Sequence, residues 1–145
     1  MSIPVELADL RAKTSEYTWA YLLTVRPNAT PHLVSLSPQW SEPAGPGSGS
    51  VILLSVSTGT TRNATAGATV TLCYPPLDHD GYSLIVDGTA VVDQDAESSS
   101  IDVPDGKQLI RFSPTGAVLH RSAAPGFANS ATGCANDCRP VTPDV

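Results

Sequence analysis

Apolar and polar positions alternate over most of the chain, and this period of two predicts strands. The run at 18–26 places two sets of side chains on opposite faces of one strand. The two sets are Trp19, Tyr21, Leu23 and Val25 on one face and Ala20, Leu22 and Thr24 on the other. Because both sets are largely apolar, we expect this strand to be buried on both sides.

Similar runs predict further strands at 32–40, 51–57, 69–74 and 82–92. Turn residues at 27–30, which read Pro-Asn-Ala-Thr, join the runs at 18–26 and 32–40 into a hairpin. Later in the chain, 107–112 and 117–121 form either a strand pair or one strand bent around residues 113–116.

The dipeptide Asp87-Gly88 falls inside the run at 82–92. Such a pair is compatible with a tight hairpin turn. We instead interpret 82–92 as one unbroken strand, in which Gly88 marks a bulge or the close approach of another backbone.

Two short helices are also predicted. Residues 3–14 fit a helix because Pro4 is tolerated in a first turn and Ile3, Leu7 and Leu10 fall on one side. A second is expected within 58–67. We expect loops at 41–50 and 96–106, and an arm or partly disordered tail at 122–145 beyond a single domain at 1–121.

The fold class follows from the number of these elements. Six or seven strands with two short helices predict a mainly β protein whose sheet closes, or nearly closes, into a barrel. Closure is favoured because it removes exposed strand edges.

Charge and cysteine content narrow the environment and the partners. Eight Lys and Arg against 14 Asp and Glu give a formal net charge of −6, and the basic residues are scattered. Such a surface repels phosphate backbones and anionic lipids, which argues against nucleic-acid and membrane partners. The N-terminus has charged residues where a signal peptide needs an apolar run. With three cysteines and no dense cysteine framework, we expect a reducing, cytoplasmic location.

Several segments in order carry a family resemblance. Residues 20–26, which end in Thr24-Val25-Arg26, lead into Pro31-His32-Leu33-Val34. The next segments are the strand at 51–57, Thr60-Thr61-Arg62-Asn63, Val70-Thr71-Leu72 and Val86-Asp87-Gly88-Thr89-Ala90. Together they resemble the pyridoxamine 5'-phosphate oxidase-like split barrels over roughly residues 6–121.

This resemblance implies a split β-barrel homodimer with two cofactor sites at the subunit interface. FMN is the cofactor in many members and a deazaflavin in others, and the chemistry implied is hydride transfer. A deazaflavin coenzyme carries a phosphodiester and a polyglutamate tail, which ask for more cations than FMN does. Because this chain offers few cations, we favour FMN and keep a deazaflavin coenzyme as the alternative.

Two departures from the family pattern bear on the substrate. The family places Lys or Arg two or three positions before the asparagine, where this chain has Thr60-Thr61. Residues 94–106 are short, acidic and serine-rich, where the true oxidases have a helical insertion and basic residues for pyridoxamine phosphate. We therefore expect a small-molecule substrate other than pyridoxamine phosphate.

The candidate phosphate site is the loop that enters the second helix. Its residues are Thr58, Thr60, Thr61, Arg62 and Asn63. Hydroxyls, backbone N–H groups and one guanidinium are the donors that a phosphate needs. The alternative is an ordinary capped helix start, since Thr and Asn are common caps.

His32 and Trp40 are the candidates for contact with a cofactor ring. For His32 we favour the alternative of a partly buried structural side chain, whereas Trp40 is equally compatible with packing at a strand end. No metal site is expected: His79 lies between two aspartates in a solvated turn, and Cys134 and Cys138 lack a second ligand pair.

These observations favour a flavin- or deazaflavin-dependent oxidoreductase whose substrate and catalytic residues the sequence does not name. Two alternatives stay open: a cofactor-binding protein without turnover, and a degenerate split barrel with a blocked pocket. Motifs of hydrolases, P-loop nucleotidases and zinc proteases are missing from the sequence.

Overall fold

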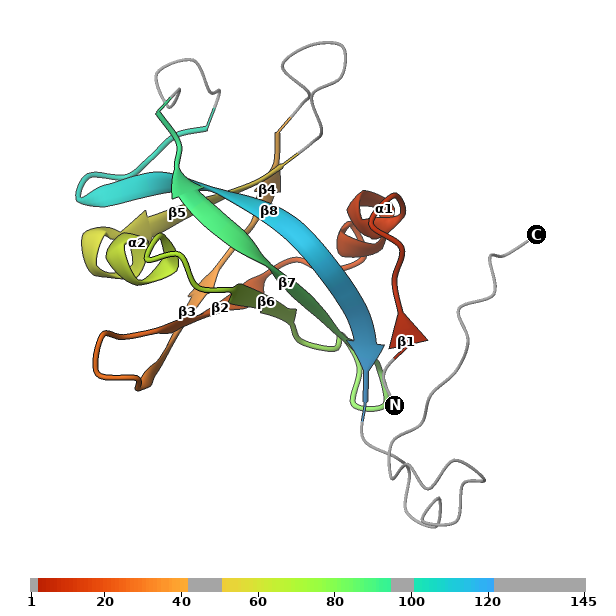
Figure 1. Cartoon of the computed structure of the whole chain (residues 1–145). Helices are drawn as coiled ribbons and strands as arrows, with labels where there is room; N and C mark the ends of the chain where they lie inside the picture. The colour runs from red at the N-terminus through yellow and green to blue at the C-terminus, as the bar shows by residue number, and fades with distance from the viewer. Residues whose placement is uncertain (1–2, 42–50, 95–100, 122–145) are drawn as a thin grey trace.

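The computed structural model describes residues 3–41, 51–94 and 101–121. Its eight strands form one antiparallel sheet that curls into a half-barrel, with a short helix near each end (Figure 1). In chain order the elements are β1 (Ile3–Pro4), α1 (Leu10–Thr14), β2 (Ala20–Val25), β3 (Pro31–Leu36), β4 (Gln39–Trp40), β5 (Ile52–Ser57), α2 (Thr58–Ala64), β6 (Val70–Tyr74), β7 (Ser83–Val92) and β8 (Lys107–His120). The predicted mainly β split barrel with two short helices is thus confirmed.

The sheet is organised around β8. The strand order is β3-β2-β6-β7-β8-β5-β4, and β1 pairs with β8 beyond the end of β5. Residues 107–120 therefore form one strand, which decides between the two alternatives left open for this segment. The inner face of the sheet holds the core, whose fully buried side chains include Leu22, Leu72, Leu84, Ile110 and Phe112.

The predicted helix at 3–14 is wrong over its first half. Ile3 and Pro4 instead form β1, where they lie opposite Leu119 and Val118 of β8. The N–H of Val5 continues this contact by donating to the carbonyl of Ala117 at 2.8 Å. Pro4 has no N–H to contribute to a ladder, which an edge strand tolerates, and Ile3 is buried in the core. β1 and the separate β4 raise the strand count above the six or seven expected.

The interpretation of Gly88 is confirmed. β7 runs unbroken through it, and the register with β8 shifts between Asp87 and Gly88. A Cβ on Gly88 would lie 2.4 Å from the carbonyl oxygen of Ser113 and 2.6 Å from Cζ of Phe112. Glycine is therefore required by the close approach of β8 at this bulge.

The two faces predicted for the strand at 18–26 are correct, but its burial on both sides is wrong for the single chain. Ala20, Leu22 and Thr24 are buried on the inner face. On the outer face Leu23 and Val25 keep 37% and 48% of their surface exposed. No element of the described chain covers this outer face of β2.

Parts of the predicted organisation lie outside the described residues: the loop at 42–50, residues 95–100 and the tail from 122 onward. In the part of the chain that the structure describes, no helix has the length and apolar character needed to cross a membrane.

Candidate functional site

The site forms where β5 ends and α2 begins. Ser57 is the N-cap of α2 and has an extended backbone, and its Oγ accepts a hydrogen bond from the N–H of Thr60 at 3.3 Å. A serine cap is typical of a helix start, and it uses one of the N–H groups that the first turn leaves unpaired. The short helix predicted within 58–67 is therefore present.

A chain of hydrogen bonds links this cap to the β2–β3 hairpin. Nη2 of Arg26 lies 2.7 Å from Nδ1 of His32, and Nε2 of His32 lies 3.4 Å from Oγ1 of Thr60. Oγ1 of Thr60 is in turn 3.0 Å from Oγ of Ser57. Arg26 and His32 of the β2–β3 hairpin, Thr60 of α2 and Ser57 of β5 thus form one polar cluster, which we call the relay.

Arg26 is fixed at the hairpin end by two further contacts. Its Nη1 donates to the carbonyl of Pro31 at 2.9 Å and lies 3.4 Å from Oγ1 of Thr30. The backbone N–H of Arg26 also donates to the carbonyl of Thr30, at 2.9 Å. These bonds hold the guanidinium beside His32, although the side chain itself lies at the exposed edge of the cluster.

The predicted phosphate residues have different positions. Thr60, Thr61 and Asn63 are buried, whereas Thr58 and Arg62 are exposed on α2. The hydroxyl of Thr61 donates to the carbonyl of Ser57 at 3.0 Å, so it stabilises the helix start. Of the five, Thr60 is the one that contacts His32.

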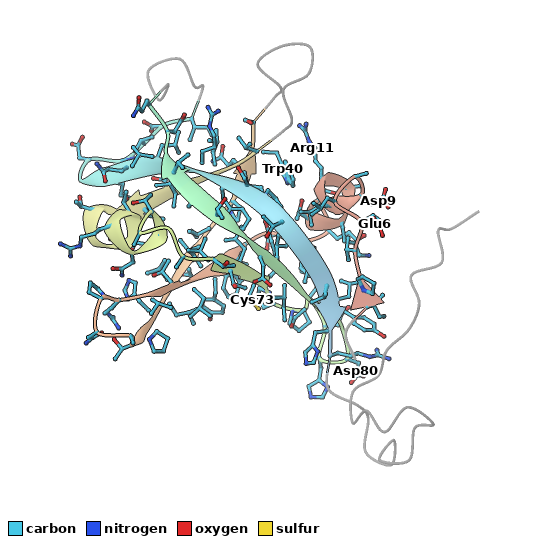
Figure 2. The ribbon with its side chains drawn as sticks, viewed as in Figure 1. Glu6, Asp9, Arg11, Trp40, Cys73 and Asp80 are labelled. Atoms are coloured by element: carbon cyan, nitrogen blue, oxygen red, sulfur yellow. The ribbon has the colours of Figure 1, made fainter. Side chains whose placement is uncertain are left out.

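Trp40 is separated from this group. It lies opposite Ile52 at the far end of β5 from Ser57, and Ile52 and Ser57 are five residue steps, roughly 17 Å, apart along the strand. Its indole N–H donates to Oγ1 of Thr14 on α1 at 2.7 Å. Figure 2 shows Trp40 on the α1 side of the molecule, away from α2. This contact supports the packing alternative for Trp40 within one chain.

Sequence reasoning missed two cations and the cap residue. Arg26 ends the Thr24-Val25-Arg26 segment, and the hairpin brings it back to His32. Lys107 lies directly opposite Ser57 in the β5–β8 ladder, so both side chains leave the same face of the sheet. Hairpin register could have suggested Arg26, but the pairing of Lys107 depends on a strand far along the chain.

A second feature lies on the outer face of the sheet, at the other end of the hairpin. A pocket of about 460 Å³ is lined by Trp19, Tyr21, Ser35, Leu36 and Ser37. The rings of Trp19 and Tyr21 meet edge to face with centroids 4.7 Å apart. Because His32 points to the inner face, this pocket and the relay are separate within one chain.

The outer face continues from this pocket as an apolar row across the strands. Tyr21 lies opposite Cys73, Cys73 opposite Ile85, and Ile85 opposite Val118. Cys73 is therefore half-exposed on the outer face (Figure 2). Partial burial raises the pKa of the Cys73 thiol.

The described residues contain no group of three His, Cys, Asp or Glu side chains that could hold a metal ion. His79 contacts its neighbour Asp80 at 3.1 Å, and both are exposed to solvent. Cys134 and Cys138 lie outside the described residues.

Solved structures define the class of this fold. An FAD-binding protein of Mycobacterium smegmatis matches with a TM-score of 0.58 and 16% identity, over 80% of this chain and 95% of its own. A Listeria innocua protein named after pyridoxamine 5'-phosphate oxidase matches with a TM-score of 0.57 and 12% identity, over 79% and 98%. The heme-storage protein HutZ of Vibrio cholerae matches at 0.53 with 14% identity, over 78% and 94%. The chain thus has the pyridoxamine 5'-phosphate oxidase-like split-barrel fold.

Sequence comparison gives nearer relatives. No known family profile matches the sequence. The chain is 39% identical over 137 residues to the uncharacterized protein Mb0449c of Mycobacterium bovis, covering 92% of each chain. The uncharacterized protein MT0457 of Mycobacterium tuberculosis matches with the same identity and coverage. The chain belongs to the family of these mycobacterial proteins.

Proposed function

We propose that this protein binds a flavin-type cofactor at the relay and acts as an oxidoreductase. The observation that carries the proposal is the relay itself, in which a guanidinium, an imidazole and two hydroxyls meet at a strand–helix junction. A phosphate group is an acceptor with a negative charge, and it needs several donors and at least one cation. Arg26, with Lys107 across the ladder from Ser57, meets that need.

The cation that the family pattern places before the asparagine is absent here, and Arg26 offers a replacement from another element. Arginine suits this role because its planar fork carries several N–H donors and it stays charged. Arg26 directs some of these donors to Pro31, Thr30 and His32, and its guanidinium keeps donor capacity at the exposed edge. The fit to a phosphate therefore rests on this chain's own side chains.

When bound, the flavin ring would supply the hydride-transfer chemistry. The chain's residues would hold and orient the cofactor. FMN is the cofactor we propose, with a deazaflavin coenzyme as the alternative, because Arg26, Arg62 and Lys107 suit one phosphate better than a polyanionic tail. The substrate would be a small molecule other than pyridoxamine phosphate, since residues 94–106 supply no basic side chain for such an anion and carry several acids.

The proposal includes a homodimer formed through the outer face. Leu33 is 54% exposed and lies opposite Leu23 on this face, which also carries Val25 and the Tyr21–Cys73–Ile85 row. An apolar surface of this kind is typical of an interaction site. We expect L33D to shift the protein to monomer in light scattering at micromolar concentration, while the same substitution at Leu7, an exposed leucine before α1, has a smaller effect. A wild-type monomer would contradict this part.

A cofactor-binding protein without turnover is the second candidate. One observation favours it: both nitrogens of His32 are used within the relay, which leaves no described side chain there for proton transfer. Two of the structural neighbours are named for binding FAD and for storing heme. A bound cofactor that dithionite reduces but no nicotinamide nucleotide reduces would support this candidate over the oxidoreductase.

The decisive experiment compares FMN with riboflavin, which differ by the phosphate alone. We expect fluorescence quenching to show wild-type protein binding FMN at least tenfold more tightly than riboflavin. R26L should remove most of that difference, because a charged hydrogen bond contributes about 1.5–3 kcal/mol. R11L, which removes one positive charge on α1, is the matched control and should preserve it.

Two results would contradict the proposal. Equal affinity for FMN and riboflavin would show that no phosphate is recognised. Absence of binding by FMN and by a deazaflavin coenzyme alike would exclude flavin-type function, whereas binding of the deazaflavin alone would select the alternative cofactor. If R62L lost the preference for FMN over riboflavin and R26L kept it, the phosphate would bind on the exposed side of α2 and not at the relay.

A further inference from the structure

We infer that His32 is a positioning residue, locked as the neutral tautomer with its proton on Nε2, and that the relay thereby presents only donors to its ligand. This inference deepens the proposed function, because it specifies the chemical class of group that the site accepts. The partners of His32 determine which atom donates and which accepts in each hydrogen bond of the relay.

Arg26 determines the direction of the hydrogen bond to His32. A guanidinium has five N–H donors, no acceptor, and no deprotonated form in proteins. Nη2 of Arg26 lies 2.7 Å from Nδ1 of His32, so Nδ1 must be the acceptor. An imidazole that accepts at Nδ1 and is neutral carries its proton on Nε2.

The hydrogen bond between His32 and Thr60 can then have only one direction. Nε2 of His32 donates to Oγ1 of Thr60 across 3.4 Å, the longest step of the relay. Both ring nitrogens of His32 therefore have a partner within the relay.

The hydroxyl hydrogens of Thr60 and Ser57 remain to be assigned. Thr60 and Ser57 have one hydroxyl hydrogen each, and the 3.0 Å bond between them uses one. Thr60 is 1% exposed, so a hydrogen left on it would be buried without a partner. The favoured arrangement has Thr60 donating to Ser57, which also accepts from the N–H of Thr60. The remaining hydrogen is on Ser57, an exposed residue, and it is available to a ligand.

The consequence is selectivity. Ser57 O–H and the outer N–H groups of Arg26 are donors, and the relay has no acceptor left for a ligand. A fully ionised oxyanion such as a phosphate monoester dianion has only acceptors and satisfies both donors. A neutral amide or hydroxyl group can accept through its oxygen, but its own N–H or O–H would find no acceptor in the relay. His32 acts here through Arg26 and Thr60 and does not itself touch the ligand.

The test begins without any ligand. Long-range ¹H–¹⁵N correlation spectra of ¹⁵N-labelled wild-type protein at about pH 8, above the ordinary histidine titration range, report which ring nitrogen is protonated. We expect His32 to show a protonated Nε2 and an unprotonated Nδ1. R26L should return His32 to a mixture of both tautomers, while R11L should not. A proton on Nδ1 in wild-type protein would overturn the inference whether or not a flavin binds.

Binding supplies the second readout. Glutamine can accept from Arg26 and donate to Thr60, whereas leucine can do neither. We therefore expect H32Q to keep the preference for FMN over riboflavin within about threefold, and H32L to reduce it about tenfold or more. Equal loss in H32Q and H32L would overturn the positioning role while leaving phosphate binding in place. Absence of any phosphate preference in wild-type protein would instead contradict the proposed function, and the spectra would still decide the tautomer.

Discussion

Gly88 offers the most direct test of how the sheet is built. Replacing it with alanine adds one Cβ at the bulge between β7 and β8. That atom would lie 2.4 Å from the carbonyl oxygen of Ser113 and 2.6 Å from the ring of Phe112, far inside the 3.4 Å at which ordinary contact begins. The first of these atoms is backbone, and Phe112 is fully buried, so neither can move aside alone.

The cost follows from what must shift. Extra volume in a packed core destabilises by about 1–3 kcal/mol, and we expect G88A at the upper end because part of the β7–β8 ladder must open as well. For a chain of this size, about 3 kcal/mol lowers the melting temperature by roughly 10 °C. Urea unfolding followed by circular dichroism measures the free energy, and a thermal scan measures the shift.

A neighbouring glycine provides the control. Gly116 lies opposite Asp87 in the same ladder, beside the same bulge, and an added Cβ there would meet nothing within 4 Å. G116A should therefore change the free energy of unfolding by less than about 0.5 kcal/mol. If G88A were as stable as G116A, the close approach of β8 at residue 88 would be refuted.

Three further predictions concern single side chains. T14V should destabilise by about 1–2 kcal/mol and shift the tryptophan emission, because the indole N–H of Trp40 loses its acceptor; T18V, at an exposed threonine, should do neither. Burial raises the pKa of Tyr74 above its ordinary value of 10.0, so the unfolded chain ionises first and stability should fall as pH rises beyond about 10. Y74F should reduce that alkaline loss, of which a part remains because burial also raises the pKa of Tyr17. Because the Tyr74 hydroxyl is buried without a partner, Y74F should cost nothing near neutral pH. Since burial also raises the pKa of the Cys73 thiol, alkylation of Cys73 near pH 8 should be slower than that of a small free thiol.

Each of these has a contradicting result. An unchanged emission spectrum in T14V would show that Trp40 does not depend on that acceptor. The same urea midpoint for wild-type protein and Y74F from pH 8 to about 11 would show that Tyr74 ionises equally in both states. The alkylation rate is measured in a variant in which the two cysteines beyond residue 121 are replaced by serine, and a rate equal to that of the small thiol would show an unperturbed Cys73.

Local pattern predicted the elements whose partners lie nearby. The alternation at 18–26 gave the two faces of β2 correctly, and the small polar run after β5 gave α2. Gly88 was interpretable because a glycine inside an alternating run usually marks a bulge or the close approach of another backbone. In each case the determining information lies within about ten residues of sequence.

The errors share one physical cause, which is dependence on distant segments. Ile3-Pro4 resembles a helix start until β8 offers it a strand edge. The outer face of β2 looks like core because its residues are apolar, yet no element of the described chain covers it. Arg26 is part of the site because the hairpin places it beside His32, and because His32 contacts Thr60 of α2. The spacing of these residues in the sequence does not predict that they lie together.

The central place of β8 has a consequence for biosynthesis. β1, β5 and β7 all take β8 as a partner, and β8 is the last described strand to be made. During translation β1 has no strand to pair with, and β5 and β7 each keep one edge open, until residues 107–120 emerge. Such long-range pairing folds slowly and leaves unpaired edges that aggregate. A nascent chain released before Lys107 would therefore give an aggregation-prone open sheet, not a smaller version of the fold.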